Sequence, residues 1–243
     1  PPPGEMEYAS GASEQKLRTE LRAYLALCEQ IDHAVGTVLE ELERSGKDRE
    51  TVIIYASDHG DYAGEHGKME KHGGISHRAI TRVPMILSVP GMQHRGVQSS
   101  SIVESVDLFP TLCDLAGIPA PNTVQGISFA PVIGDPDQTA RKNALTENAY
   151  RKALATDNWR YVANIDGQPD ELYNLREDPW ELENRIDDPS CSAVAAELLR
   201  ALLDRVARAR RPITSINGHW HDHRYDDDGR IDLQSCGPTN EYW

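Results

Sequence analysis

The sequence lacks a long apolar run, an excess of basic charge and any closely spaced pair of cysteines. No stretch approaches the about 20 consecutive apolar residues of a membrane-spanning helix, so no membrane span is expected. Lys and Arg number 25 against 39 Asp and Glu, which gives a formal net charge of -14. Nucleic-acid binding requires clustered basic residues that neutralise phosphates, so RNA and DNA are not expected as partners.

The cysteines form no recognisable disulfide framework or metal-binding pair. They are four scattered residues, Cys28, Cys113, Cys191 and Cys236. The first two fall at apolar positions of predicted helices, so we interpret them as small buried hydrophobic residues. The chain starts with three prolines and a glycine, which is neither an initiator methionine nor the typical start of a signal peptide. We therefore expect the true N-terminus to lie upstream, in a protein whose composition is that of a soluble globular chain.

The spacing of apolar residues divides the chain into regions with different predicted secondary structure. An apolar stripe at spacings of three and four residues predicts a helix over about 14–45, with Ser13 as its N-cap and Gly46 at its end. The stripe consists of Leu17, Leu21, Tyr24, Cys28, Ile31, Val35, Val38 and Leu42. Such a helix should pack this stripe against a large partner surface.

Two short β-branched runs follow this helix, at 51–56 and 83–89, and predict strands covered on both faces. A short helix is expected over 107–116. Together these elements predict an α/β fold in which residues 1–140 form part of a mixed, mostly parallel sheet flanked by helices. This region is interpreted as the C-terminal part of a larger catalytic domain.

The pattern changes after residue 140. Short strand candidates at 144–147, 153–156, 159–165 and 171–175 alternate with turn residues, and a helix is predicted over 193–209. We therefore expect residues 141–210 to form a smaller antiparallel sheet with a C-terminal helix. Residues 211–243 are polar and turn-rich, and are expected to be an irregular tail.

The segment most informative for chemistry is Ser57-Asp58-His59-Gly60-Asp61, at the end of the first predicted strand. Ligands bind at the carboxyl ends of strands in open α/β sheets. Asp58 offers a carboxylate oxygen and His59 an imidazole, and Gly60 permits a sharp turn that lets both reach one cation. By itself the dipeptide is also compatible with a solvated turn.

The surrounding motifs resemble the sulfatase family of the alkaline phosphatase superfamily. The apolar strand and S-D-H-G-D are followed by G-E-H-G at 64–67, by Lys71 and by R-V-P at 82–84. Further matches in the same order are E-S-V-D-L-F-P-T-L at 104–112, Q-G-I-S at 125–128 and E-L-Y-N-L at 171–175. The resemblance covers about residues 20–190.

This resemblance implies roles for particular residues. Asp58 and His59 match metal ligands, for Ca²⁺ or another divalent cation such as Mg²⁺ or Mn²⁺. Lys71 matches the lysine that contacts the sulfate and stabilises its charge, and His72 is predicted to line the substrate pocket. His77 is the alternative to His72 on the same loop, and His66 is interpreted as shaping that loop rather than acting in catalysis. The tract of His219, His221 and His223 with Asp222 could bind a metal, but is interpreted as a solvated or packed tail.

The sequence also departs from the family. Sulfatases use a formylglycine made from Cys or Ser within C/S-x-P-x-R, and none of the four cysteines lies in such a motif. The resemblance therefore implies a fragment that acts on a sulfate ester together with an absent upstream part. Two alternatives stay open: a phosphonate or phosphate monoester hydrolase of the same superfamily, or a non-catalytic truncated protein. The particular ester and the oligomeric state are not indicated.

Overall fold

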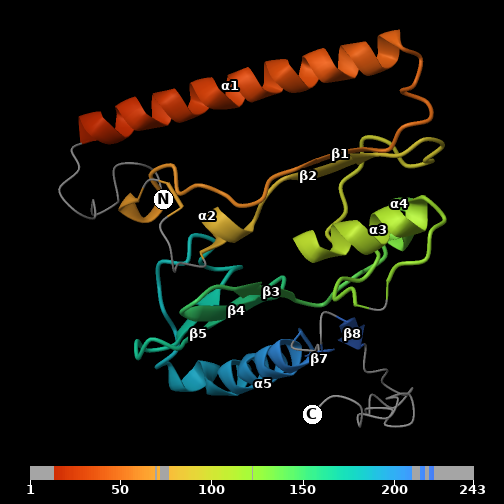
Figure 1. Ribbon diagram of the computed structural model, residues 1–243. Helices are drawn as coiled ribbons and strands as arrows, with labels where there is room; N and C mark the ends of the chain where they lie inside the picture. Colours follow the sequence, from red (N-terminus) through yellow and green to blue (C-terminus); the bar gives the residue numbers. More distant parts are fainter. Residues whose placement is uncertain are drawn as a thin grey trace.

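The computed structural model describes residues 14–68, 70–71, 77–121 and 123–209, together with the backbone of 214–216 and 219–221. Figure 1 shows helix α1 lying along one side of a two-stranded sheet formed by β1 and β2. The sheet that contains β3, β4 and β5 lies on the other side with helix α5, next to α3 and α4. The α/β class, with a smaller antiparallel sheet and a C-terminal helix, is confirmed.

Helix α1 (Glu14–Arg44) matches the predicted span closely. It ends because Gly46 adopts a positive φ of 70°. The Gly46 N–H then donates to the Glu43 carbonyl at 2.9 Å and the Lys47 N–H to the Leu42 carbonyl at 3.2 Å. This pair of bonds satisfies carbonyls that a helix end otherwise leaves without partners. The predicted N-cap, Ser13, lies outside the described residues.

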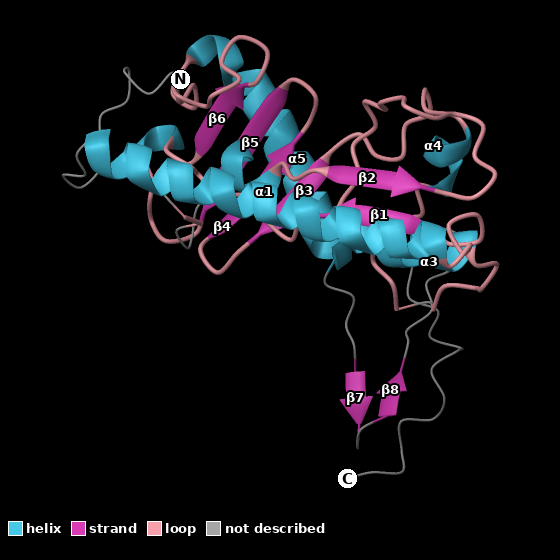
Figure 2. Ribbon diagram, turned by 90° about the horizontal axis from the view of Figure 1, so that it is seen from above, coloured by secondary structure: helices cyan, strands magenta, loops and turns pink. Residues whose placement is uncertain are grey.

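The apolar stripe of α1 is only partly covered, contrary to expectation. Leu17 is buried, but Ile31 is 52% and Val38 is 66% exposed, and Cys28 is exposed as well. Figure 2 shows α1 crossing above β1 and β2. Leu21, Tyr24, Val35 and Leu42 are half-buried. Periodicity identifies the face of a helix that is apolar, but burial depends on a neighbouring surface, which the described part of the chain supplies only in part.

Strands β1 (Ile53–Ala56) and β2 (Met85–Ser88) pair antiparallel, with Ile53 opposite Ser88 and Ala56 opposite Met85. The mostly parallel direction expected for this sheet is not found in this pair, because the chain returns through residues 57–84 at the end of the sheet where β1 stops. Neither strand is covered on both faces, since Tyr55 is 38% and Ile86 63% exposed. The long connection, which holds the candidate site residues, is thereby placed at the carboxyl end of β1.

A buried carboxylate joins the next helices to the rest of the fold. The 3-10 turn η3 (Ser105–Asp107) leads into the predicted helix, α3 (Leu108–Leu115), and α4 (Ala130–Gly134) was not predicted. Asp107 is fully buried and accepts hydrogen bonds from the backbone N–H groups of Ile127 and Glu104 at 2.8 and 2.9 Å. It also pairs with the Arg141 guanidinium.

The small sheet contains four antiparallel strands in sequence order: β3 (Ala144–Glu147), β4 (Arg151–Ala155), β5 (Trp159–Asn164) and β6 (Glu171–Asn174). The turn η4 (Pro189–Cys191) leads into α5 (Ser192–Ala209), which covers one face. The core between them contains Leu154, Tyr161, Leu172, Cys191, Leu198 and Leu202. The prediction of an antiparallel sheet with a covering helix is confirmed.

The C-terminal region contains two short paired strands, β7 (Thr214–Ile216) and β8 (His219–His221). The expectation of a wholly irregular tail was therefore wrong for these residues. The overlooked signal is Asn217-Gly218 between the strands, a dipeptide typical of two-residue hairpin loops. Most of 211–243, including Asp222 and His223, lies outside the described residues, and the domain boundaries near 140 and 210 stay predictions.

Within the described residues, no helix is both long and apolar enough to cross a membrane.

Candidate metal and anion site

The Asp58 and His59 side chains lie together just beyond the end of β1. Asp58 Oδ1 accepts the His59 backbone N–H at 2.9 Å, and Ser57 Oγ donates to the His59 carbonyl at 2.8 Å. These local bonds fold the chain back on itself, as short polar side chains do in turns. Asp58 Oδ2 comes to 3.5 Å from His59 Nε2, with the Asp58 side chain 84% exposed. Both side chains therefore converge on one point at the surface.

The hydrogen bonds of His59 assign its tautomer. Nδ1 lies 2.9 Å from the Gly60 carbonyl oxygen, which can only accept. Nδ1 therefore holds the proton, and Nε2 keeps a free lone pair, which can accept a hydrogen bond or bind a cation. A histidine whose other nitrogen is fixed by a backbone carbonyl is well oriented to bind a cation.

Lys71, further along the loop between β1 and β2, also lies next to the Asp58 and His59 side chains. Its Nζ lies 3.1 Å from His59 Nε2, so the ammonium donates to the free lone pair. The hydrogen bond from the His59 backbone N–H lowers the pKa of the Asp58 carboxyl, and the nearby Lys71 ammonium lowers it further. Asp58 is thus ionised at neutral pH, the form in which a carboxylate binds metal. The structure brings together three of the four predicted site residues, and the fourth, His72, lies outside the described residues.

The donor set fits part of a cation site but does not complete one. A carboxylate oxygen and an imidazole nitrogen 3.5 Å apart can both reach one ion at bond lengths of about 2.0–2.6 Å. Among the described residues, however, no group of three or more His, Cys, Asp or Glu side chains is arranged to hold a metal. Any further ligands would have to come from elsewhere.

Gly60 sets the position of this turn through a close approach to helix α2 (Arg78–Thr81). Its N–H donates to the Ile80 carbonyl at 2.7 Å. A Cβ at residue 60 would lie 1.9 Å from the Ala79 carbonyl oxygen, closer than any real contact. The turn that holds Asp58 and His59 therefore rests directly on the backbone of α2.

We expect Gly60→Ala to destabilise the protein by about 1–3 kcal/mol, because the new methyl group must push this turn and α2 apart. The matched control is Gly36→Ala in the middle of α1, where an added Cβ meets nothing within 4 Å. That change should stabilise by about 0.5–1 kcal/mol, since alanine favours a helix over glycine. Urea denaturation followed by circular dichroism measures both. Equal effects of the two changes would contradict the close approach.

A buried polar cluster, which sequence reasoning missed, lies behind this turn. Tyr62 is fully buried, and its hydroxyl hydrogen-bonds His77 Nδ1 at 2.8 Å. The rings of His66 and His77 stack with centroids 4.0 Å apart, and His77 meets Tyr173 edge-on at 6.2 Å. Burial, with His66 adding to it, lowers the pKa of His77 to about 3, so its ring is neutral at physiological pH. The position of His66 agrees with a loop-shaping role.

Strand alternation could have indicated part of this cluster. Tyr161 and Leu172 face α5, so their neighbours Arg160 and Tyr173 must face the opposite side of the sheet. There Arg160, 3% exposed, pairs with Glu181, also 3% exposed, at 3.2 Å. Charged residues are almost never buried unless paired, and sequence alone did not reveal this pair.

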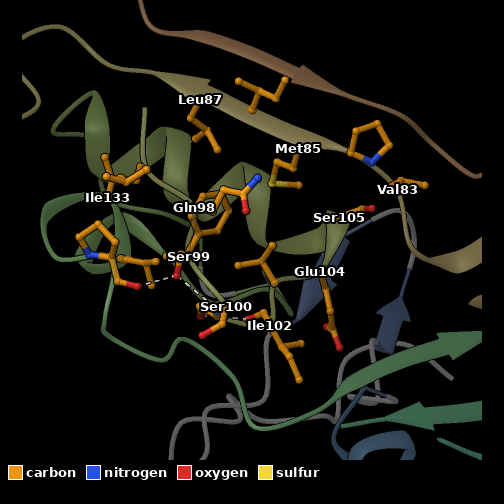
Figure 3. Close-up of a pocket in the computed structure, with 18 of the residues that line it drawn as sticks. Val83, Met85, Leu87, Gln98, Ser99, Ser100, Ile102, Glu104, Ser105 and Ile133 are labelled. Carbon is orange, nitrogen blue, oxygen red and sulfur yellow. Dashed lines mark hydrogen bonds between the residues drawn. The ribbon is translucent and has the colours of Figure 1, made fainter. Parts of the chain in front are cut away.

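A wide groove with a mixed polar and apolar lining lies between β2 and the segment that leads to α3. Figure 3 shows Met85 and Leu87 pointing from β2 into this groove, with Ile133 and Ile102 on the facing side. Serine side chains at 99 and 100 contribute the polar part of the lining. The groove leaves this face of the β1–β2 sheet open.

Comparison with known proteins gives two family matches that together span most of the chain. The family model described as Sulfatase matches residues 1–118. The model described as N-sulphoglucosamine sulphohydrolase, C-terminal, matches residues 64–208.

Individual proteins are similar over only part of their own length. Arylsulfatase K of Bos taurus is 32% identical over 187 residues, covering 71% of this chain and 34% of the bovine protein. A structure solved in complex with its substrate, D-glucosamine-2-N,6-O-disulfate, superimposes with a TM-score of 0.76 at 27% identity, covering 85% of this chain and 44% of the solved one. The phosphonate monoester hydrolase of Agrobacterium radiobacter has a TM-score of 0.74 at 23% identity, covering 89% and 47%, and shows a shared fold alone. The chain thus spans between a third and a half of these proteins.

Proposed function

This chain belongs to the sulfatase family of the alkaline phosphatase superfamily, and on that premise we propose that it supplies part of the metal- and sulfate-binding site of a sulfuric ester hydrolase. The observation that carries the proposal is the convergence of Asp58, His59 and Lys71, which are distributed over the loop from β1 to β2. The same three residues match the family motif, so geometry and resemblance point to one site.

The proposed roles follow from the charges of these residues. Asp58 and His59 would hold a divalent cation, Ca²⁺ or alternatively Mg²⁺ or Mn²⁺, which when bound attracts electrons from the sulfate oxygens. Lys71 would place its ammonium on the sulfate, where it offsets the negative charge that spreads over the oxygens as the ester bond breaks. His72 would line the substrate pocket beside Lys71.

The nucleophile in this proposal is a formylglycine from a C-x-P-x-R segment upstream of the present chain. The open surfaces support an additional part of the fold. The stripe of α1, the faces of β1 and β2 and the groove in Figure 3 present apolar side chains, among them Val38 and Ile86, that a folded protein usually buries. An upstream part of the same polypeptide is the proposed cover.

Sulfated sugars are the proposed substrate class. One matching family model is named for an N-sulphoglucosamine sulphohydrolase, and one similar structure contains a disulfated glucosamine as its substrate. A phosphonate monoester hydrolase of the same superfamily is the second candidate, favoured by one structural likeness that shows only the fold. A non-catalytic protein that retains the fold is the third.

We expect purified residues 1–243 to hydrolyse no chromogenic aryl sulfate above buffer, with or without Ca²⁺. A metal and a lysine stabilise charge but do not replace a covalent nucleophile that divides a difficult hydrolysis into easier steps. A chain extended upstream through C-x-P-x-R, matured to formylglycine, should gain activity and should prefer an aryl sulfate to an aryl phosphonate.

The outcomes separate the three candidates. A preference of the extended chain for the phosphonate would favour the phosphonate monoester hydrolase. An upstream sequence without C-x-P-x-R would favour the non-catalytic protein. Metal-dependent turnover by residues 1–243 alone would contradict the proposal, because a nucleophile would then lie within this sequence.

A further inference from the structure

The loop that holds the candidate site is attached to the small sheet through one buried ion pair. Glu181, in the turn after β6, accepts the backbone N–H of Arg78 at 2.7 Å through Oε2. Its partner Arg160, on β5, donates to Thr81 Oγ1 at 3.1 Å. Arg78 and Thr81 are the first and last residues of α2, so the pair fixes both ends of this one-turn helix.

Helix α2 in turn supports the Asp58-His59 turn. Gly60 donates to Ile80 and lies against the Ala79 carbonyl with no room for a side chain. A displacement of α2 must therefore move Gly60, and with it the His59 carbonyl and ring. The path from Glu181 to His59 passes only through short, directional contacts.

A parallel path leads to Lys71. The Tyr62 N–H donates to the Glu70 carbonyl at 3.2 Å, and Glu70 immediately precedes Lys71. Tyr62 is held by His77, which directly precedes α2 and stacks on His66. Both halves of the candidate site therefore depend on the same face of the small sheet.

We propose that Glu181, with Arg160, is a positioning residue that fixes the geometry of Asp58, His59 and Lys71 from the small sheet through α2. This inference rests on the proposed function, because it assigns Glu181 a purpose in that site. Glu181 is suited to the task because its backbone holds a positive φ of 56° and its carboxylate is almost fully enclosed, so its side chain has little freedom. Burial raises the pKa of Glu181 to about 7 although Arg160 opposes the shift, which indicates how strongly the site is desolvated.

Hydrogen exchange of residues 1–243 tests the mechanical part of the inference. In Glu181→Ala, peptides covering 57–62 and 78–84 should exchange at least about tenfold faster, because local opening frees the Gly60 and Arg78 amides. Peptides covering β5 should exchange faster by a clearly smaller factor, the part that the unpaired Arg160 costs in overall stability. Glu183→Ala is the matched control, since Glu183 lies two residues away with its side chain 68% exposed.

The conservative variant Arg160→Met/Glu181→Gln separates positioning from general stability. It removes both buried charges and the Arg160 bond to Thr81 but keeps a carbonyl oxygen for the Arg78 N–H, so protection of 57–62 should return in part. In the extended chain, Glu181→Ala should weaken Ca²⁺ binding about 10- to 100-fold, the usual cost of losing an outer support of a metal ligand. The double variant should restore part of that affinity.

Two results would overturn the inference: exchange at 57–62 and Ca²⁺ affinity in Glu181→Ala equal to those of Glu183→Ala, or equally faster exchange in β5, which would mean general unfolding. The exchange experiment needs no catalysis. If the extended chain hydrolyses no sulfate ester, the proposed function fails. Hydrogen exchange of residues 1–243 still shows whether Glu181 holds the turn of Asp58 and His59 in place.

Discussion

Replacing Asp58 with alanine is expected to lower kcat/KM of the extended, formylglycine-bearing chain by on the order of 10²–10³-fold or more, the scale for losing one electrostatic group from a catalytic site. The carboxylate contributes the only formal negative charge that faces His59 Nε2 in the described site, so its loss removes the hard oxygen ligand. Isothermal titration with Ca²⁺ measures the loss of metal affinity, and steady-state kinetics measure the loss of kcat/KM. Excess Ca²⁺ should recover part of the activity if the remaining ligands still hold the ion.

Asp48→Ala provides the control for charge. Asp48 is exposed in the turn before β1, at the opposite end of the strand from the site. Its removal changes net charge equally and should leave kcat/KM and Ca²⁺ affinity within about twofold, as for surface changes of about ±0.5 kcal/mol. Similar activity of the Asp58 and Asp48 variants would exclude Asp58 as a metal ligand.

The largest loss of stability is expected from Asp107→Ala, at about 3–5 kcal/mol, the cost of breaking a buried ion pair from one side. The change would leave the Arg141 guanidinium, 9% exposed, with only the longer 3.4 Å contact to Glu104. It would also leave the backbone N–H groups of Ile127 and Glu104 without their acceptors. Urea denaturation gives the change in unfolding free energy.

Asp114→Ala is the matched comparison, because Asp114 lies in the same helix, α3, with an exposed side chain. We expect it to change stability by no more than about 0.5 kcal/mol. A loss below about 1 kcal/mol for Asp107→Ala would show that the Asp107 and Arg141 pair does not hold α3 to the small sheet.

The sequence predicted those elements whose signals are local. The 3.6-residue period of α1 and its stop at Gly46 gave both ends of the helix closely, and short apolar runs between turn residues located β3 to β6. The antiparallel pairing of β1 with β2 could not be predicted in this way, because a run of β-branched residues does not indicate whether a strand lies parallel or antiparallel to its neighbour. Burial of the α1 stripe could not be predicted either, because exposure depends on what surrounds a helix.

The candidate site was predicted through its motifs rather than its geometry. Asp58 and His59 are adjacent, and the approach of Lys71 was implied by resemblance. The support behind them could not be found in this way, since Arg160 and Glu181 come from a different part of the chain and look like ordinary surface charges. Long-range contacts of this kind leave no periodic signal.

The four-stranded sheet also determines an order of events during folding. Its strands follow one another through short turns, so the contacts that build it are local, and local contacts form fast. The β1–β2 pair has to close the long segment 57–84 first, which costs more chain entropy. The surface of Arg160 and Tyr173 should therefore exist before the loop folds onto it, so that the small sheet acts as a template on which the turn of Asp58 and His59 takes its shape.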